Sequence, residues 1–251
     1  MRSVLFRSSA CAIVVLLAAC DNSGGTSAED TTAGFTTAAD ALVATLQAGA
    51  PAASDPAVVA FEAEADKALR TLGTPALPLN GFDSYDALCG KTATIVSAYV
   101  NLGVDQLPEA SKAEAMVRNV TQYLDQMFTP LLFSTHCTAA HLPFVEEETV
   151  DDVSGQAAAL LQIRGGAHQQ VTGLLQMAGD PILDAARRRR IVDLLGADAA
   201  SFAIILSLAQ RQELAAMVDT VKASLPDADQ AAADAVKAEL TAAPCGPLCQ
   251  M

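Results

Sequence analysis

Apolar residues recur every three or four positions along most of the chain, which is the spacing of one face of an amphipathic helix. In the first half, this pattern predicts helices over residues 36–47, 56–72, 84–102 and 108–128. The Asp-Pro pair at residues 55–56 is typical of a helix start, with an aspartate cap and proline in the first turn. We expect Pro130 to break or kink the chain at Thr129, and residues 141–148 to form an acidic connection.

The second half of the chain shows the same helical spacing. It predicts a helical stretch over residues 151–177, a helix from Asp180 to Gly196, another from Asp198 to Leu225, and a last one from Asp227 or Asp229 to about Ala243. The apolar run 202–209 is too short to span a membrane and is expected in a helix buried on all sides. No alternating strand of useful length is present. The pattern therefore predicts an all-α, multi-helix bundle of roughly seven to nine helices.

Composition supports this fold class. The chain has no Trp, 4% aromatic residues and abundant alanine, a combination that favours helix over sheet. We expect one helical domain over residues 35–251. Residues 73–83, which begin with a loop rich in proline and glycine, are where a sub-boundary would fall.

The first nineteen residues have the features of a targeting segment. Arg2 and Arg7 precede an apolar stretch, residues 10–19, that is shorter than the roughly 20 residues of a membrane-spanning helix. The stretch ends in Leu-Ala-Ala directly before Cys20. This ending resembles the lipobox of bacterial lipoproteins, which implies cleavage before Cys20 and a lipid on its thiol. An ordinary secretory signal and an uncleaved anchor are the alternatives.

The resemblance covers about the first twenty residues and implies a location in the bacterial cell envelope. The chain would be anchored to the inner or outer membrane, with its folded part facing the periplasm or the exterior. Two acyl chains suffice for stable anchoring. Residues 20–34 are small and polar and are expected to form a flexible tether with a reach of about 20 Å.

The charge balance bears on the partner. Loss of the leader removes two arginines, which leaves 13 basic residues against 29 acidic ones and a net charge of −16. Nucleic acids and anionic lipids bind clustered cations, so this balance argues against either as the main partner of the folded part. We expect another envelope or secreted protein as partner, and membrane contact through the lipid on Cys20.

The cysteine count predicts disulfides. Six cysteines reduce to four once Cys11 leaves with the leader and Cys20 is acylated, and an even number in an exported chain indicates pairing. The four are Cys89, Cys137, Cys245 and Cys249, which allow three pairings. We favour Cys89–Cys137 with Cys245–Cys249, since residues four apart in a helical turn lie about 6 Å apart, within disulfide reach.

Four consecutive arginines, residues 187–190, form the strongest local run of charge. They cannot make one flat basic face, because successive helical residues point about 100° apart. The middle two each have an aspartate four residues away, at positions 184 and 193, and are expected to pair with it. Arg187 and Arg190 then remain to bridge neighbouring helices or to bind an acidic partner or lipid head group.

Other residue types form no recognisable catalytic or metal pattern. His136, Cys137 and His141 lie near the acidic residues 146–152, but their spacing matches no usual zinc site. The motif at residues 245–249 has three residues between its cysteines, where thioredoxin-like motifs have two. His168 has no evident partner and is expected at the surface or an interface. We expect no metal, no cofactor and no catalytic residue.

These features favour a non-enzymatic binding or accessory lipoprotein. One concrete version is an immunity protein, a protective inhibitor of a secreted toxin, because such proteins are often small, acidic, exported and lipid-anchored. Two alternatives remain open. One is a carrier of an apolar ligand in a cavity between alanine-rich helices, and the other is an envelope enzyme that works through carboxylates.

Overall fold

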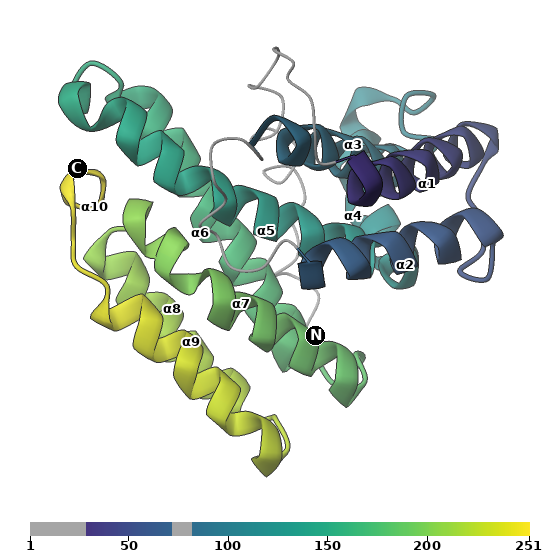
Figure 1. Ribbon diagram of the computed structural model, residues 1–251. Helices are drawn as coiled ribbons and strands as arrows, with labels where there is room; N and C mark the ends of the chain where they lie inside the picture. The colour runs from purple at the N-terminus through teal and green to yellow at the C-terminus, as the bar shows by residue number, and fades with distance from the viewer. Residues whose placement is uncertain (1–28, 72–81) are drawn as a thin grey trace. The chain divides into compact units, whose positions relative to one another are not determined.

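The computed structural model describes the backbone of residues 29–71 and 82–251 (Figure 1). Residues 1–28, which hold the leader, Cys20 and most of the tether, lie outside the described residues, as does most of the sub-boundary expected near residues 73–83. The described part folds into ten α-helices, nine of them at least seven residues long, with no β-strand in it. The predicted all-α fold is confirmed.

The chain divides into two compact units, and the division falls within α5 (Leu124–Thr149), between Cys137 and Thr138. Besides the start of α5, the first unit contains α1 (Glu29–Ala48), α2 (Pro56–Thr71), α3 (Phe82–Val100) and α4 (Glu109–Gln122). In this unit α1 packs against α2 and α3, and α3 packs against α4. The predicted tether is too long, since residues 29–34 already belong to α1.

Three phenylalanines mark the core of the first unit. The ring of Phe35 in α1 lies 5.2 Å from that of Phe61 in α2 and 5.0 Å from that of Phe133 in α5. All three side chains are fully buried. Aromatic pairs at this separation contribute about 0.5–1.5 kcal/mol beyond their buried area, so these contacts tie the three helices together.

The predicted start of α2 is confirmed. Asp55 caps the helix with its Oδ1 atom, which accepts a hydrogen bond from the backbone N–H of Ala57 at 2.9 Å. At the end of α1, Gly49 adopts a φ of +147°, and after α3 Gly103 adopts a φ of +69°. Residues other than glycine rarely adopt these angles, so Gly49 stops α1 where the sequence indicated. The helix α3 ends at Val100, two residues before the expected Leu102, and Gly103 lies in the turn that follows.

The expected end at Thr129 and the expected connection over residues 141–148 are both wrong. The helix α5 continues from Leu124 to Thr149 through Pro130 and Pro143, and the break lies earlier, at Tyr123. Proline in a helix interior costs about 3 kcal/mol. Every residue from 127 to 140 is buried, and each large apolar side chain buried contributes about 1.5–3 kcal/mol. At Pro130, burial therefore outweighs the proline penalty.

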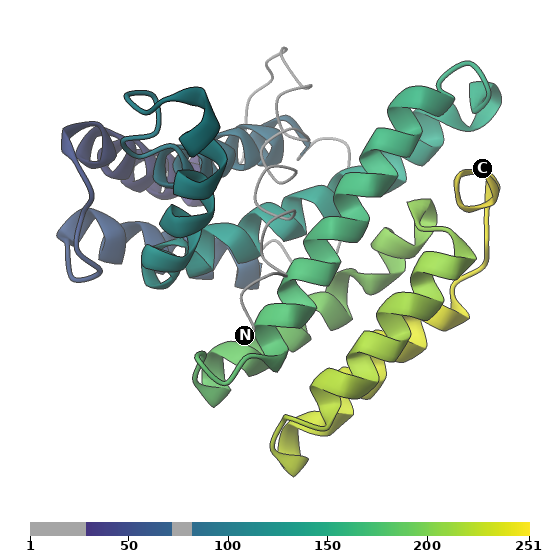
Figure 2. The ribbon, with the colours of Figure 1, turned by 180° about the vertical axis from the view of Figure 1, so that it is seen from behind.

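The second unit contains the rest of α5, η4 (Val150–Asp152), α6 (Ala157–Gly179), α7 (Ala185–Ile205), α8 (Leu208–Lys222), η5 (Asp227–Asp229), α9 (Gln230–Ala242) and α10 (Pro247–Gln250). In it, α6 packs against α7 and α8, and α9 packs against the same two helices. Consequently α7 and α8 occupy opposite corners of a four-helix arrangement, visible from behind in Figure 2. The short α10 lies against α7.

The predicted boundaries around α7 need correction. Pro181 lies in a turn, and the helix begins at Ala185 with Asp184 as its cap, because the Asp184 carboxylate accepts the N–H of Arg187 at 2.8 Å. Gly196 does not end the helix, and Asp198 does not begin the next one.

The chain breaks instead between α7 and α8, where Ser207 and Gln210 form a reciprocal capping box. The break interrupts the apolar run 202–209, and Leu208 is 56% exposed. The expectation that this run is buried on all sides is therefore wrong at its end.

Candidate functional site

The disulfides have the pairing that the sequence favoured. Cys89 of α3 bonds to Cys137 of α5, with their Cα atoms 5.7 Å apart, and Cys245 bonds to Cys249 with a Cα separation of 5.2 Å. The first bond staples two helices of the first unit. The second closes a small loop around α10. Cys20 lies outside the described residues.

The arginine run lies at the start of α7, and its middle residues fix the connection between α8 and α9. Arg189 donates to Asp193 at 2.7 Å, as predicted, and also to Asp229 at 2.7 Å. These two hydrogen bonds raise its pKa, that to Asp229 most. The predicted pairing of Arg188 with Asp184 is wrong, because Asp184 caps the helix and Arg188 donates to the carbonyl of Ser224 at 2.9 Å.

Arg187 and Arg190, the residues predicted to bind a partner, are both half-buried. The Nε atom of Arg187 lies 4.0 Å from the carboxylate of Asp184, at the limit of an ion pair. Both arginines have further interactions within the chain. Their role toward a partner remains a prediction.

The residues with metal-like side chains are spread along one helix. His136, Cys137 and His141 all lie in α5, and Cys137 is occupied by its disulfide. In the part of the chain that the structure describes, no three histidine, cysteine, aspartate or glutamate side chains are placed to hold a metal ion.

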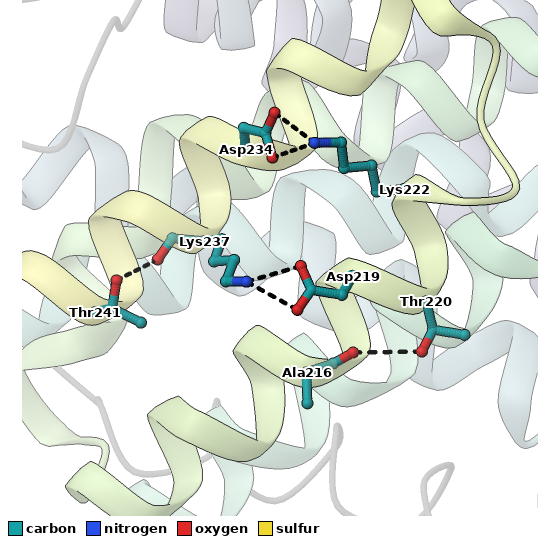
Figure 3. A network of polar contacts seen from close by, with 7 residues as sticks. All are labelled: Ala216, Asp219, Thr220, Lys222, Asp234, Lys237 and Thr241. Carbon is teal, nitrogen blue, oxygen red and sulfur yellow. Dashed lines mark hydrogen bonds and ion pairs between the residues drawn. The ribbon is translucent and has the colours of Figure 1, made fainter.

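Two ion pairs join α8 to α9 on the surface of the second unit (Figure 3). Lys222 of α8 donates to both carboxylate oxygens of Asp234 at 2.7 Å, and Lys237 of α9 donates to both oxygens of Asp219 at 2.8 Å. All four side chains are between 32% and 56% exposed. Exposed pairs of this kind contribute about 0–1 kcal/mol each.

A buried arginine of α6, Arg164, reaches the C-terminal part of the chain. Its side chain is 7% exposed. It donates from Nε to the carbonyl oxygen of Ile205 at 2.7 Å, from Nη1 to that of Met251 at 3.0 Å, and from Nη2 to that of Leu248. One guanidinium therefore connects α6, the end of α7 and α10.

Arg211 of α8 plays a matching role and is only 2% exposed. Its Nε donates to the carbonyl oxygen of Leu206 at 3.1 Å and its Nη1 to that of Ala243 at 2.7 Å. Its Nη2 donates to the carbonyls of Ala203 and, at 3.3 Å, Pro244. We call Arg164 and Arg211 together the arginine node.

The electrostatics of the arginine node depend on helix ends. The carbonyls that accept its hydrogen bonds lie at or just beyond the C-terminal ends of α7, α9 and α10. A helix carries roughly half a negative charge at that end, which favours a cation. Burial lowers the pKa of both arginines, but a guanidinium stays charged at neutral pH. The helix ends and their carbonyls thus stabilise two charges that burial alone would disfavour.

One helical turn beyond Arg164, α6 carries a polar segment, residues 168–172. The Nε2 atom of His168 lies 3.4 Å from a carboxylate oxygen of Glu213 in α8, too long for a good hydrogen bond. The side chain of His168 is 19% exposed and that of Glu213 is 60% exposed. Residues four apart share a helix face, so Arg164 and Thr172 lie on the same face of α6 as His168, one turn before it and one turn after it.

The polar segment is unusual because several of its buried atoms have no hydrogen-bond partner among the described residues. These atoms are Nε2 of His168, Oε1 of Gln169, both amide atoms of Gln170, and Oγ1 of Thr172. Gln170 is the most buried, at 2% exposure, and lies on the other side of α6 from His168.

In native proteins most buried polar groups are hydrogen-bonded, and each exception costs about 1–3 kcal/mol. Such local conflicts are expected mainly at functional sites, where a ligand or partner compensates for them. The α6 polar segment, together with Glu213, is therefore the candidate site.

Sequence reasoning missed the arginine node and left His168 without a partner. Arg164 follows the buried Leu160 by four residues, and Arg211 precedes the buried Leu214 by three. An arginine at an apolar position of a helical pattern was the available signal. The partner of His168 could not be read from the sequence, because Glu213 belongs to another helix.

Comparisons with known proteins found no matching family model, no similar curated protein and no similar solved structure. Among the described residues, no helix is both long enough and apolar enough to cross a membrane.

Proposed function

We propose that the protein is a lipid-anchored lipoprotein of the bacterial cell envelope that acts as a non-enzymatic binding or accessory protein. The lipobox-like leader supports the anchor at Cys20. The observation that carries the proposal is the pairing of all four remaining cysteines in two disulfides, Cys89–Cys137 and Cys245–Cys249. Disulfides persist in oxidising compartments and are rare in the cytosol, so the pairing supports export.

The binding role draws on the α6 polar segment. Polar atoms that are buried without partners lower the stability of the free protein, and a partner that supplies hydrogen bonds recovers that free energy. The exposed carboxylate of Glu213 gives a partner access to the edge of the segment. The strongly acidic composition supports a basic partner surface. An immunity protein for a secreted toxin is the concrete form of this role that we favour.

The anchor is tested by Cys20→Ala. The wild-type chain should fractionate with membranes and carry the added mass of acyl chains, and the variant should lose both properties. A Cys20→Ala chain that stays in the membrane fraction with unchanged mass would show that lipid on Cys20 is not the anchor.

The binding site is tested by photo-crosslinking in the native envelope. A photoreactive residue replaces Glu213 in one variant and Asp234 in a matched control, because both carboxylates are similarly exposed, at 60% and 56%. We expect one crosslinked protein in near-stoichiometric yield from position 213 and none from 234. A third variant, at Arg187, tests the arginine run.

If the product forms only at Arg187, the arginine run and not the polar segment contacts the partner. If no position gives a product, the binding role is wrong.

A further inference from the structure

The last nine residues of the second unit, 243–251, bridge the two helices that carry the candidate site. Arg164 of α6 donates to the carbonyls of Leu248 and Met251 within this segment. Arg211 of α8 donates to the carbonyls at positions 243 and 244. Four of the seven hydrogen bonds of the arginine node thus hold one short segment across α6 and α8.

The disulfide of this segment lies entirely within it. Cys245 bonds to Cys249, and the backbone N–H groups of Cys249 and Gln250 both donate to the carbonyl of Gly246, at 3.1 and 3.2 Å. The bond therefore folds the segment on itself without linking it covalently to the rest of the unit. What holds the segment in place is the arginine node and the burial of Leu248, which is fully buried.

The segment also lies close to the candidate site along α6. Arg164 precedes His168 by four residues, which is about one turn on the same face of the helix. On α8, Arg211 and Glu213 are two residues apart and point to opposite sides, so proximity to the site comes from Arg164 alone. Its hydrogen bonds hold the carbonyls of residues 248 and 251 about one turn of α6 away from the contact between His168 and Glu213.

We propose that residues 243–251 form a thiol-sensitive clasp that closes one end of the α6–α8 interface and limits access to His168. The significance of this access rests on the proposed function, whereas the clasp itself stands on its own contacts. A dithiol reductant would transfer two electrons and two protons to the Cys245–Cys249 bond, giving two thiols and an oxidised reductant. Cys245 is half-buried and thus accessible to such a reductant.

Loss of the bond should loosen the clasp by a calculable amount. In the chain-entropy model, opening a loop of five residues corresponds to about a 30-fold change in the opening equilibrium. Hydrogen exchange measures such local opening directly. The double substitution Cys245→Ser with Cys249→Ser removes this bond alone and leaves Cys89–Cys137 intact.

The test compares this double variant with the parent mature protein in two measurements. Hydrogen–deuterium exchange at positions 249 and 250 should be about 30-fold faster in the variant. Modification of His168 by diethyl pyrocarbonate should be several-fold faster, while modification of His136, which is 4% exposed, should not change. A partially reduced parent, with only Cys245 and Cys249 alkylated, should behave in the same way.

Unchanged exchange at positions 249 and 250 would show that the bond does not hold the clasp closed. Faster exchange with unchanged modification of His168 would show that the clasp does not cover the site. Faster modification of His136 as well would mean that the double variant is generally unfolded. Modification of His168 in the partially reduced parent then decides whether the clasp covers the site. None of these outcomes affects crosslinking at position 213, so the clasp and the proposed function can fail separately.

Discussion

Replacement of Gln170 by methionine tests whether the α6 polar segment is a source of instability in the free protein. Gln170 is 2% exposed, and neither of its amide atoms has a hydrogen-bond partner among the described residues. Methionine has a similar length, no polar donor, and a flexible side chain that fills irregular space. Removing a buried, unpaired polar group recovers about 1–3 kcal/mol.

Gln170→Met should therefore stabilise the mature chain. A gain of about 2 kcal/mol corresponds to a Tm increase of about 4–8 °C for a chain of this size. Thermal and urea unfolding followed by circular dichroism measure the change. Leu174→Met, one turn further along the same buried stripe, is the matched control, and its cost should stay below about 1.5 kcal/mol.

The opposite result would refute the reasoning. If Gln170→Met lowers the stability by more than its control does, the amide of Gln170 makes hydrogen bonds in the free protein. Gln170 would then drop out of the candidate site, which would be reduced to His168, Gln169 and Thr172.

Three further predictions concern other charged or titrating groups. Arg211→Met should destabilise the second unit by about 3–5 kcal/mol in urea unfolding, because it leaves four backbone carbonyls in two segments, 203–206 and 243–244, without this donor. A loss below about 1 kcal/mol would contradict this role. A double-mutant cycle on Asp219 and Lys237 should give a coupling free energy of unfolding of about 0.2–1 kcal/mol, which disappears in 1 M salt because the pair is exposed and therefore screened. A coupling that persists in 1 M salt would contradict this reasoning. Burial, and secondarily the nearby carboxylates of Glu62 and Asp55, raise the pKa of Tyr99, so the folded state holds its proton more tightly than the unfolded state does. The stabilisation from protonated Tyr99 is fully present below about pH 10 and is lost as the pH rises above that value. Tyr99→Phe should therefore flatten the fall in the free energy of unfolding above about pH 10, measured by urea unfolding at a series of pH values.

Local sequence signals predicted the parts of the fold that local physics determines. The Asp55 cap, the glycine stop at residue 49 and the pairing within residues 245–249 each depend on a few neighbouring residues. Local rules failed at Pro130, where burial of the surrounding helix outweighs the penalty of proline, and at Pro143, which lies beyond the buried stretch 127–140. The degree of burial depends on helices elsewhere in the chain and is not contained in the local pattern.

The candidate site was less predictable than the fold. The carbonyls that Arg164 contacts lie 41, 84 and 87 residues further along the chain, so no spacing rule identifies them. The contact between His168 and Glu213 likewise requires two helices to be placed side by side. The arginine run was easier to interpret in part, since the pair of Arg189 with Asp193 at separation four was found. The capping role of Asp184 and the bonds of Arg188 and Arg189 to the distant residues 224 and 229 were missed.

The two surface ion pairs between α8 and α9 have a consequence for how these helices can align. Because the helices are antiparallel, residues 219 and 222 of α8 meet residues 237 and 234 of α9. A slip of α9 by three residues in one direction would place Asp219 opposite Asp234, and the same slip in the other direction would place Lys222 opposite Lys237. Each misaligned state therefore brings like charges together. The pairs contribute little to stability, but they penalise both neighbouring registers and so favour a single alignment of the hairpin.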